Sequence, residues 1–545
     1  MKKEKWLLLG ILLYLLVNIA GLFVPIVINA AKYAQIGREM LDNGNWINLT
    51  IGEEAYDQKP PLLFWIAALV FQVSGISIIS YKATILIISL AGVYGTFKLA
   101  SLLYDKRTGL LAAFMWGTCL GYVHFHNDIH TDTLLVVPVV LAIWQYAAYF
   151  KENNNYQFYL GTIFTGLGML TKGPVAIVII GAAVGLHLLL TCNFKAIFNY
   201  RWLIAVPIVL ILILPALWGL YNQFGMEGIK FYFWTNNFGR ISGSYAGHNT
   251  DLFFYLHTTL YMIAPWAAFG LVGTFLQIRE KVQKRRHFTG EDEFYTLGAI
   301  LVFLLINSLA KAKNPHYELV ILPLISILAA HWAYMIFEKT NFAKLRKILG
   351  LIHLFTGSFL MVFAGIFLII VFPEKRIWIW LIIILLAGAF FYVLTWKNSL
   401  NKQLTYLVLA ISVFLFTLNT TILPALSKYQ SSFEACSIFN EKAKPGEKLH
   451  IFTQESRYWE IFLYSKNYGR YMITSEDFKQ INPPANDWLF TGREGIKQLT
   501  EMKVPVDTMG VFRHNSMTRL PLKFLNPKTR ESKLKVRYLL KLRKN

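Results

Sequence analysis

Long apolar stretches alternate with short charged segments through the first 424 residues of the chain. Each stretch has about 20 residues, the helix length that crosses about 30 Å of hydrocarbon. Because a backbone inside lipid must satisfy its own hydrogen bonds, these stretches are expected to be helices. About thirteen spans are predicted, at residues 6–28, 80–103, 108–125, 132–150, 157–171, 174–191, 202–221, 254–277, 292–310, 317–337, 349–373, 376–396 and 403–424.

Two apolar segments need a separate interpretation. Segment 60–76 is short and opens with Pro60-Pro61, so it predicts a helix lying at the membrane interface rather than a span. The run from Trp6 to Ile28 follows a basic start, as in a signal peptide. It is longer than a typical signal-peptide core and has no clear small-residue cleavage site, which predicts an uncleaved first helix.

The last part of the chain has a different composition. Segments 449–453 and 488–491 are typical of strands, and 496–502 is typical of a short helix. About 120 residues are enough for a core. The predicted fold class is therefore an all-α polytopic membrane domain at 1–424, followed by a small soluble α/β domain at 425–545.

Composition supports a lipid bilayer as the main partner. Only 15% of the 545 residues are charged, whereas soluble chains carry about 25%. The net charge of +22 lies in short loops and the tail, not on one basic face, so no nucleic-acid partner is expected. Cys119, Cys192 and Cys436 have neither a disulfide pattern nor metal-ligand spacing.

Lys and Arg in the short loops set the expected orientation. The basic loops include Lys106-Arg107, Lys344 to Lys347, and Arg279 to Arg286, and they fall on the same side as Lys2 and Lys3. That side is predicted to be the cytoplasm of a bacterial cell, with the protein in the inner membrane. An odd number of spans then places the C-terminal domain on the outer, periplasmic side.

Polar and ionisable residues gather in the loops predicted to face outward, about 29–79, 126–131, 222–253 and 311–316. Such residues at a membrane surface tend to mark function. Simple snorkelling explains any one of them equally well, but it explains less well several loops on one side. The candidates are Asn29, Tyr33, Lys59, Asp128, His130, Asp132, Lys172, Arg240, His316 and Tyr317.

The residue types suggest roles. Lys59, Lys172 and Arg240 would neutralise a lipid phosphate or pyrophosphate leaving group. Asp128 or Asp132 would be the general base on an acceptor hydroxyl. His130 is a helper or an ordinary loop residue, and the loop interpretation is favoured.

Two further patterns have a plain explanation. His124, His126 and His130 are spaced by two or four residues near a helix end, and a spacing of two shares a face only in an extended chain, so a metal site is not favoured. The aromatic run from Phe231 to Trp234 fits an interfacial belt, with a lipid or sugar groove as the alternative.

An ordered series of motifs resembles the bacterial aminoarabinose (lipid A) transferases, relatives of the protein O-mannosyltransferases with the GT-C architecture. The resemblance covers about residues 1–425. Its motifs are Lys32 to Met40, Gln58 to Trp65, Thr131 to Leu135, Leu170 to Pro174, Phe231 to Trp234, Phe238 to Arg240, Pro265-Trp266, Lys313 to Tyr317 and Leu322-Pro323.

This resemblance implies a glycosyltransferase that takes a sugar from a polyprenyl-phosphate donor. The acceptor would be a glycolipid or a secreted protein. Lys59 and Lys172 would bind the lipid phosphate, with Arg240 and Tyr317 nearby. His316, Tyr33 and Asn29 lie in or beside the same motifs and are candidate substrate-binding residues. No cofactor is expected, and dependence on a divalent metal stays open.

The chain departs from the family pattern in its first outer loop. Asn29 and Ala30 stand where the family usually has an acidic residue, and Gln58 replaces another. Either Asp128 or Asp132 supplies the base, or the acceptor needs little base help, or the chain is a non-catalytic lipid-binding member. A lipid or solute transporter is a further alternative, but neither the repeats nor the broken helices typical of one are clear.

Overall fold

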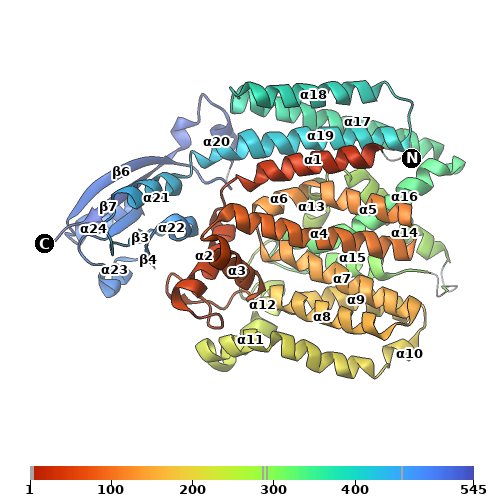
Figure 1. Cartoon of the computed structure of the whole chain (residues 1–545), viewed down its shortest axis with the longest axis horizontal. Coiled ribbons are helices and arrows are strands. Elements are labelled where there is room, and N and C mark those ends of the chain that lie inside the picture. The colour runs from red at the N-terminus through yellow and green to blue at the C-terminus, as the bar shows by residue number, and fades with distance from the viewer. Residues whose placement is uncertain (1–4, 285–287, 290–291, 456–457, 519, 545) are drawn as a thin grey trace.

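The computed structural model describes residues 5–284, 288–289, 292–455, 458–518 and 520–544. Lys2, Lys3, Arg285 and Arg286 of the predicted cytoplasmic side lie outside the described residues. Long helices lie side by side with their axes roughly aligned, and a small sheet-containing unit lies at one end of them (Figure 1).

The helical part accounts for most of the chain. Seven helical segments among the described residues are long and apolar enough to cross a membrane, and four shorter helices are also apolar. The helices of this part are α1 (Lys5–Leu22), α4 (Ile78–Leu103), α5 (Lys106–Thr118), α6 (Leu120–Asn127), α7 (Thr131–Glu152), α8 (Asn155–Lys172), α9 (Val175–Leu190), α10 (Phe194–Ile197), α11 (Arg201–Lys230), α13 (Phe254–Met262), α14 (Ala267–Lys284), α15 (Tyr295–Leu309), α16 (Leu322–Glu338), α17 (Ala343–Ile366), α18 (Ile377–Leu394) and α19 (Leu400–Thr417).

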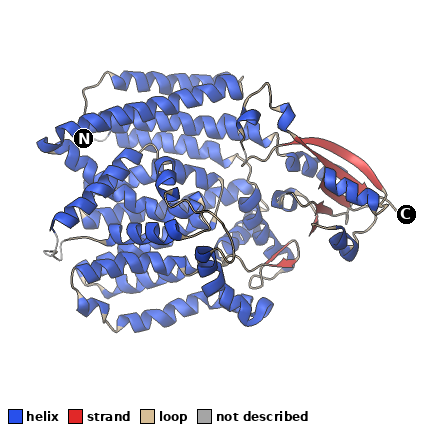
Figure 2. Cartoon of the chain, turned by 180° about the vertical axis from the view of Figure 1, so that it is seen from behind, coloured by secondary structure: helices blue, strands red, loops and turns tan. Residues whose placement is uncertain are grey.

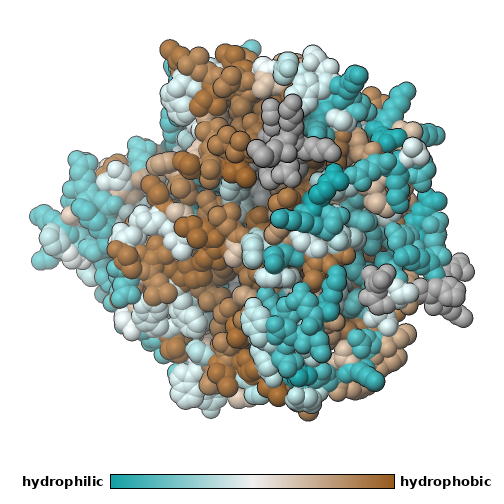
Figure 3. Space-filling view, turned by 45° about the vertical axis from the view of Figure 1, so that its right-hand side comes forward, coloured by the Kyte–Doolittle hydropathy of each residue, from teal (hydrophilic) through white to brown (hydrophobic). Residues whose placement is uncertain are grey.

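Hydrophobic side chains cover the middle of this bundle. Figure 3 shows them as a brown band between hydrophilic ends. Leu203, Ile211, Phe355 and Leu385 are among the exposed large side chains, with 69% to 77% of their surface accessible. A soluble protein rarely exposes so extensive an apolar surface, whereas lipid tails cover it without cost.

Two predicted spans are broken. The span at 108–125 is divided between α5 and α6, and that at 254–277 between α13 and α14. Pro265, which has no backbone N–H, lies in the second break. The breaks meet: the Leu120 N–H donates to the Ala264 carbonyl at 2.8 Å. The expectation of unbroken helices was therefore wrong. A break in a membrane helix leaves backbone groups without partners, and here the two breaks satisfy each other through this hydrogen bond.

The segments predicted to face outward contain more helix than the sequence predicts, and the first of them, 29–79, is called here the first outer segment. The segment 222–253 contains the end of α11, the π-turn η1 (Phe231–Thr235) and α12 (Asn236–Ser242). The first outer segment contains α2 (Ile28–Asn43), the hairpin β1 (Thr50–Ile51) and β2 (Glu54–Ala55), and α3 (Leu62–Ser74). The helix predicted at 60–76 is confirmed as α3, and its position at the membrane interface stays a prediction. Shorter turns are η2 (Pro315–Ile321), η3 (Thr340–Phe342), η4 (Phe367–Val371) and η5 (Leu418–Ile422).

The C-terminal unit is a five-stranded mixed sheet with helices (Figure 2). The strand order is β4-β3-β5-β7-β6; β3 is parallel to β4 and β5, and β7 is antiparallel to β5 and β6. The predicted strands are confirmed as β3 and β5, and the predicted helix as α24. The elements are α20 (Leu423–Ser427), α21 (Ser431–Lys442), β3 (Leu449–Phe452), α22 (Trp459–Tyr464), β4 (Tyr468–Met472), α23 (Ser475–Ile481), β5 (Trp488–Gly492), α24 (Arg493–Glu501), β6 (Val506–His514), α25 (Leu522–Leu525), η6 (Glu531–Lys533) and β7 (Lys535–Leu542).

One hydrophobic core joins the first outer segment to the sheet. Ile36 and Phe64 belong to the same buried cluster as Ile461 and Trp488. The buried Arg38 of α2 donates to the carbonyls of Phe462, Leu463, Ser465 and Lys466 at 2.8–3.2 Å, at the end of α22. The carbonyls of Phe462 and Leu463 are among those that a helix end leaves without partners, and Ser465 and Lys466 directly follow the helix. The C-terminal unit therefore holds α2, and with it the loop that leads to Lys59.

Candidate active site

Asp132 and Lys172 meet where two antiparallel helices end on the same side of the bundle. Asp132 lies in the first turn of α7, and Lys172 is the last residue of α8. A helix start favours an anion and a helix end favours a cation, so each charge suits its position. The Lys172 Nζ forms an ion pair with the Asp132 carboxylate, and both side chains are more than 90% buried.

The turn after Lys172 explains the motif Thr171-Lys172-Gly173-Pro174. Gly173 has a φ of +81°, which a residue with a Cβ adopts only with strain. Pro174 then starts α9, where a missing N–H costs nothing. The chain reverses directly after Lys172, which keeps this side chain at the end of the bundle.

Arg240 and Tyr317 complete the same side of the site. The Arg240 guanidinium, from α12, donates to the Tyr317 hydroxyl at 3.2 Å and to the Asn236 side chain at 2.9 Å. The Lys172 Nζ lies 4.0 Å from the centre of the Tyr317 ring, a cation–π contact. Asn314 also donates to the Tyr317 hydroxyl, at 3.1 Å.

Lys59 joins these residues from the loop before α3. The Asn236 amide donates to the Gln58 carbonyl at 3.0 Å, which ties this loop to α12. Lys59, Lys172, Arg240, Tyr317 and Asn236 together line a cavity of about 210 Å³, called here the cation pocket. Burial, with the charges of Lys172 and Arg240, lowers the pKa of Lys59 well below its usual range. An anion in the pocket would relieve this repulsion.

Asp128, His130 and His316 lie next to Asp132. The Asp128 carboxylate is 3.2 Å from His130 Nε2, and 31% of its side-chain surface is exposed. The rings of His130 and His316 are 4.4 Å apart, and His316 Nε2 is 3.9 Å from the Asp132 carboxylate. Burial opposes ionisation of Asp128, but the neighbouring His130 holds its pKa below the usual 3.8. His130, interpreted from the sequence as an ordinary loop residue, thus contacts two of the candidates.

The remaining two candidates differ in position. Tyr33 is buried, and its ring centre lies 6.2 Å from that of His130. Asn29 lies in the first turn of α2, beside Ile28, whose N–H donates to Glu460 of the C-terminal unit at 3.3 Å. Within the described part of the chain, Asn29 has no hydrogen bond or ion pair with the other candidates.

Sequence reasoning missed Asn236 and Asn314, the two amides that hold Arg240, Tyr317 and Gln58. Asn236 lies between the motifs Phe231 to Trp234 and Phe238 to Arg240, and Asn314 lies inside the motif Lys313 to Tyr317. Their adjacency to charged motif residues was the available signal. Across the described ranges, no group of three or more His, Cys, Asp or Glu is arranged to hold a metal ion.

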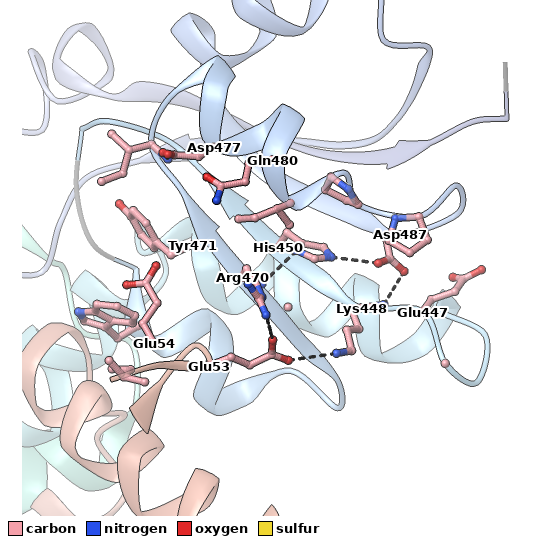
Figure 4. A pocket seen from close by; sticks show the side chains of 18 of the residues that line it. Glu53, Glu54, Glu447, Lys448, His450, Arg470, Tyr471, Asp477, Gln480 and Asp487 are labelled. Atoms are coloured by element: carbon pink, nitrogen blue, oxygen red, sulfur yellow. Dashed lines mark hydrogen bonds and ion pairs between the residues drawn. The ribbon is translucent and has the colours of Figure 1, made fainter. Parts of the chain in front are cut away.

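Two further cavities border the site. An apolar groove of about 480 Å³ lies between α8, α9 and α11, and Phe233 lines both this groove and the cation pocket. A polar cavity of about 1170 Å³, called here the outer cavity, lies between the first outer segment and the C-terminal unit (Figure 4). Its lining includes Lys32, Tyr56, Asp57 and Gln58, so it reaches the residue directly before Lys59.

Known proteins resemble the chain in both sequence and fold. Residues 58–218 match the family described as dolichyl-phosphate-mannose-protein mannosyltransferase. An undecaprenyl phosphate-alpha-4-amino-4-deoxy-L-arabinose arabinosyl transferase of Yersinia pestis (strain Pestoides F) is 26% identical over 400 residues, 69% of this chain and 68% of that protein. The crystal structure of ArnT from Cupriavidus metallidurans bound to undecaprenyl phosphate superposes with a TM-score of 0.75 at 13% identity, over 99% of this chain and 98% of that one.

The chain has the fold of that ArnT structure and is similar in sequence to the aminoarabinose transferases. The resemblance inferred from the motifs is therefore confirmed, as is the fold class of a helical membrane part with a small C-terminal strand-containing part. The chain is a multi-pass inner-membrane protein. The number of thirteen spans stays a prediction.

Proposed function

We propose that this GT-C protein is a membrane glycosyltransferase that moves a sugar from a polyprenyl-phosphate donor to a hydroxyl or phosphate at the periplasmic face. The acceptor is an envelope glycolipid or a secreted protein. One observation carries the proposal: three cationic side chains line a small pocket that shares Phe233 with an apolar groove facing the membrane helices. A lipid that ends in a phosphate needs both features together.

The donor would be held at both ends by this arrangement. The groove, lined by residues such as Ile180, Val184 and Leu210, would take isoprene units. Lys59, Lys172 and Arg240 would take the phosphate, and His316 and Tyr33 would border the sugar. Two cations at least are needed to balance a phosphate in a site where burial strengthens charge interactions.

The reaction would be a single displacement at the anomeric carbon. The acceptor oxygen forms a bond to that carbon, and the bond from the carbon to the phosphate oxygen breaks with its electron pair. Lys59 and Arg240 stabilise the leaving phosphate. Asp128 accepts the proton of an acceptor hydroxyl, because it is part-exposed and its lowered pKa keeps it ionised at neutral pH. Asp132, paired with Lys172, would position that cation instead.

Orientation and domain division belong to the same proposal. The N-terminus is cytoplasmic, and the C-terminal unit, residues 425–545, is periplasmic with the membrane domain at 1–424. The basic loops support this orientation. Asn29, at the start of α2 and outside the lining of the cation pocket, would shape the junction with the C-terminal unit rather than act as a base.

Transfer from a radiolabelled pool of polyprenyl-phosphate sugars to membrane and secreted fractions tests the proposal. Wild-type protein should transfer label. The single variants Lys59→Ala and Lys172→Ala should each lose donor binding. Donor binding without transfer would favour a non-catalytic lipid-binding protein. Unchanged donor affinity in both lysine variants would refute the phosphate pocket.

A further inference from the structure

The outer cavity ends beside the cation pocket, where an acceptor must arrive. Asp57 and Gln58 line the outer cavity, and the next residue, Lys59, lines the cation pocket. The walls are the hairpin of the first outer segment on one side and β3, β4 and α23 of the C-terminal unit on the other (Figure 4). An inference about the acceptor made from this cavity therefore rests on the proposed function.

The charge balance of this cavity is the reverse of that of the chain. The whole chain has 53 Lys and Arg against 31 Asp and Glu. The cavity is lined by four Lys and Arg side chains and six Asp and Glu side chains: Lys32, Lys444, Lys448, Arg470, Glu53, Glu54, Asp57, Glu447, Asp477 and Asp487. A cavity for a polyanion would have the opposite excess.

Two of the cations share one carboxylate partner. Glu53 pairs with Arg470 at 2.7 Å and with Lys448 at 3.4 Å, across the junction between hairpin and sheet. The Lys32 Nζ lies 5.2 Å from the Tyr33 ring centre and 5.4 Å from that of Tyr56. With six carboxylates against four cations, the lining as a whole still has an excess of negative charge.

The carboxylates of Glu54 and Asp57, unlike that of Glu53, are not in ion pairs within the described residues, and both line the cavity. Glu54 is exposed and Asp57 is half-buried. Carboxylates accept hydrogen bonds only, so they match hydroxyl groups and repel phosphate.

Amide and aromatic side chains complete the lining. Gln480 and Asn486 offer both donors and acceptors. Trp459 and Tyr471 also line the cavity, with ring centres 5.6 Å apart. Aromatic rings offer broad apolar faces with a polar rim, which suits a ligand that has an apolar face and many hydroxyl groups.

His450 and Asp487 in the same cavity do not form a second catalytic pair. His450 Nε2 is 3.0 Å from the Asp487 carboxylate, and Nδ1 accepts the Arg470 N–H at 3.0 Å. With both ring nitrogens engaged, His450 has no atom left for a proton transfer, and its role is to hold β3 and β4 in place.

We propose that the outer cavity binds the acceptor and selects a neutral, polyhydroxylated glycan, with Glu54 and Asp57 excluding glycans that carry a phosphate near the transfer position. This narrows the acceptor to an unphosphorylated sugar surface within the classes proposed above. Glu54 and Asp57 act as specificity residues, and neither takes part in the displacement.

A matched pair of probes tests the proposal. The full-length protein in nanodiscs of neutral lipid is titrated with N,N′-diacetylchitobiose and with the same disaccharide bearing a 1-phosphate, followed by ligand-observed NMR. We expect the neutral disaccharide to bind at least tenfold more tightly. In the double variant Glu54→Gln/Asp57→Asn, the ratio of the two affinities should fall to about threefold or less, since two negative charges are removed. Glu494→Gln with Glu501→Gln on the exposed face of α24 is the control and should behave as wild type.

Donor binding is measured in the same samples with undecaprenyl phosphate, so that the two proposals fail separately. Equal or tighter binding of the phosphorylated disaccharide, no binding of either disaccharide, or tighter binding of a lysine-rich peptide overturns the glycan assignment while donor binding stands. Loss of undecaprenyl phosphate binding in the wild type would instead overturn the proposed function.

Discussion

The cation pocket and the outer cavity lie next to each other but have opposite charge. Three cations line the first around a single Asp132–Lys172 pair, whereas carboxylates outnumber cations in the second. Asp57 and Lys59 face different cavities although they are two residues apart. One short loop therefore separates a place suited to a phosphate from a place suited to hydroxyl groups, and the reacting groups would meet at that loop.

The two regions also differ in how rigidly their charges are held. In the cation pocket, Lys172 and Asp132 are buried, and Arg240 is fixed by Asn236 and Tyr317. In the outer cavity, the ion pairs of Glu53 are half-exposed to water. Buried charges cannot be removed without a large penalty, but exposed pairs contribute little. Substitutions should accordingly have far larger effects in the first region.

The largest effect is expected for Lys172→Ala. The change removes one phosphate ligand and leaves the buried Asp132 uncompensated, which costs about 3–5 kcal/mol where a buried pair is broken. The value of kcat/KM should fall by about 1000-fold, mainly through lost donor binding. Lys444→Ala, in the exposed rim of the outer cavity, is the matched control and should stay within twofold to threefold, as is usual for surface charges. A donor affinity like wild type in Lys172→Ala would contradict the division between the regions.

Asp128→Asn should come next, with a fall in kcat of about 100-fold, the usual range for a lost general base. Donor affinity should not change, because Asp128 lies outside the cation pocket. The base must be ionised, and its pKa lies below 3.8, so the wild-type rate should fall only as the pH drops below that value. Steady-state kinetics across pH would check both points. An acid limb between pH 5 and 7 would exclude Asp128.

These expectations show which parts of the site were readable from the sequence. Asp132 and Lys172 could be predicted because helix ends and the Gly173-Pro174 turn place charges at known positions. Arg38 could not be assigned, because its four carbonyl partners lie at the end of α22 and just after it, more than 400 residues later. A pattern along the chain contains no information on such a contact.

The sequence predicted the fold to a similar extent: it indicated single elements but not the contacts between distant segments. Apolar length predicted the long helices, and β-branched and aromatic runs predicted β3 and β5. The strand β7 (Lys535–Leu542) contains three basic residues, although it is an interior strand that pairs with β5 on one side and β6 on the other. Its charges obscured the alternating pattern. The breaks at Cys119 and Ile263 to Trp266 are stabilised by each other, so neither is visible from its own segment.

A pH titration of donor binding should show a smaller effect, about tenfold, within the cation pocket alone. The cationic form of Lys59 binds phosphate, and burial beside Lys172 and Arg240 lowers its pKa well below 10.5. Affinity for undecaprenyl phosphate should thus weaken as the pH rises, at a lower pH than an ordinary lysine would give. Lys59→Arg should remove this dependence, because arginine keeps its charge. The same pH profile in Lys59→Arg would assign the titration to another group.

The smallest effect is expected for Glu53→Gln, which removes the partner of Arg470 and Lys448 in the outer cavity. Both pairs are half-exposed, so the free energy of unfolding should fall by about 1 kcal/mol or less. Transfer to the acceptor should change by only about twofold to fivefold, because the hairpin is still held by the buried core around Ile36, Phe64 and Trp488. Freed Arg470 and Lys448 would also make the cavity more attractive to phosphate, so the small change should favour a phosphorylated glycan over a neutral one. Arg470→Gln, which removes a cation instead, should shift that preference the other way, and thermal unfolding with competition between the two glycans would measure both. A tenfold or larger loss of donor binding in Glu53→Gln would mean that the hairpin pairs, rather than the shared core, position Lys59.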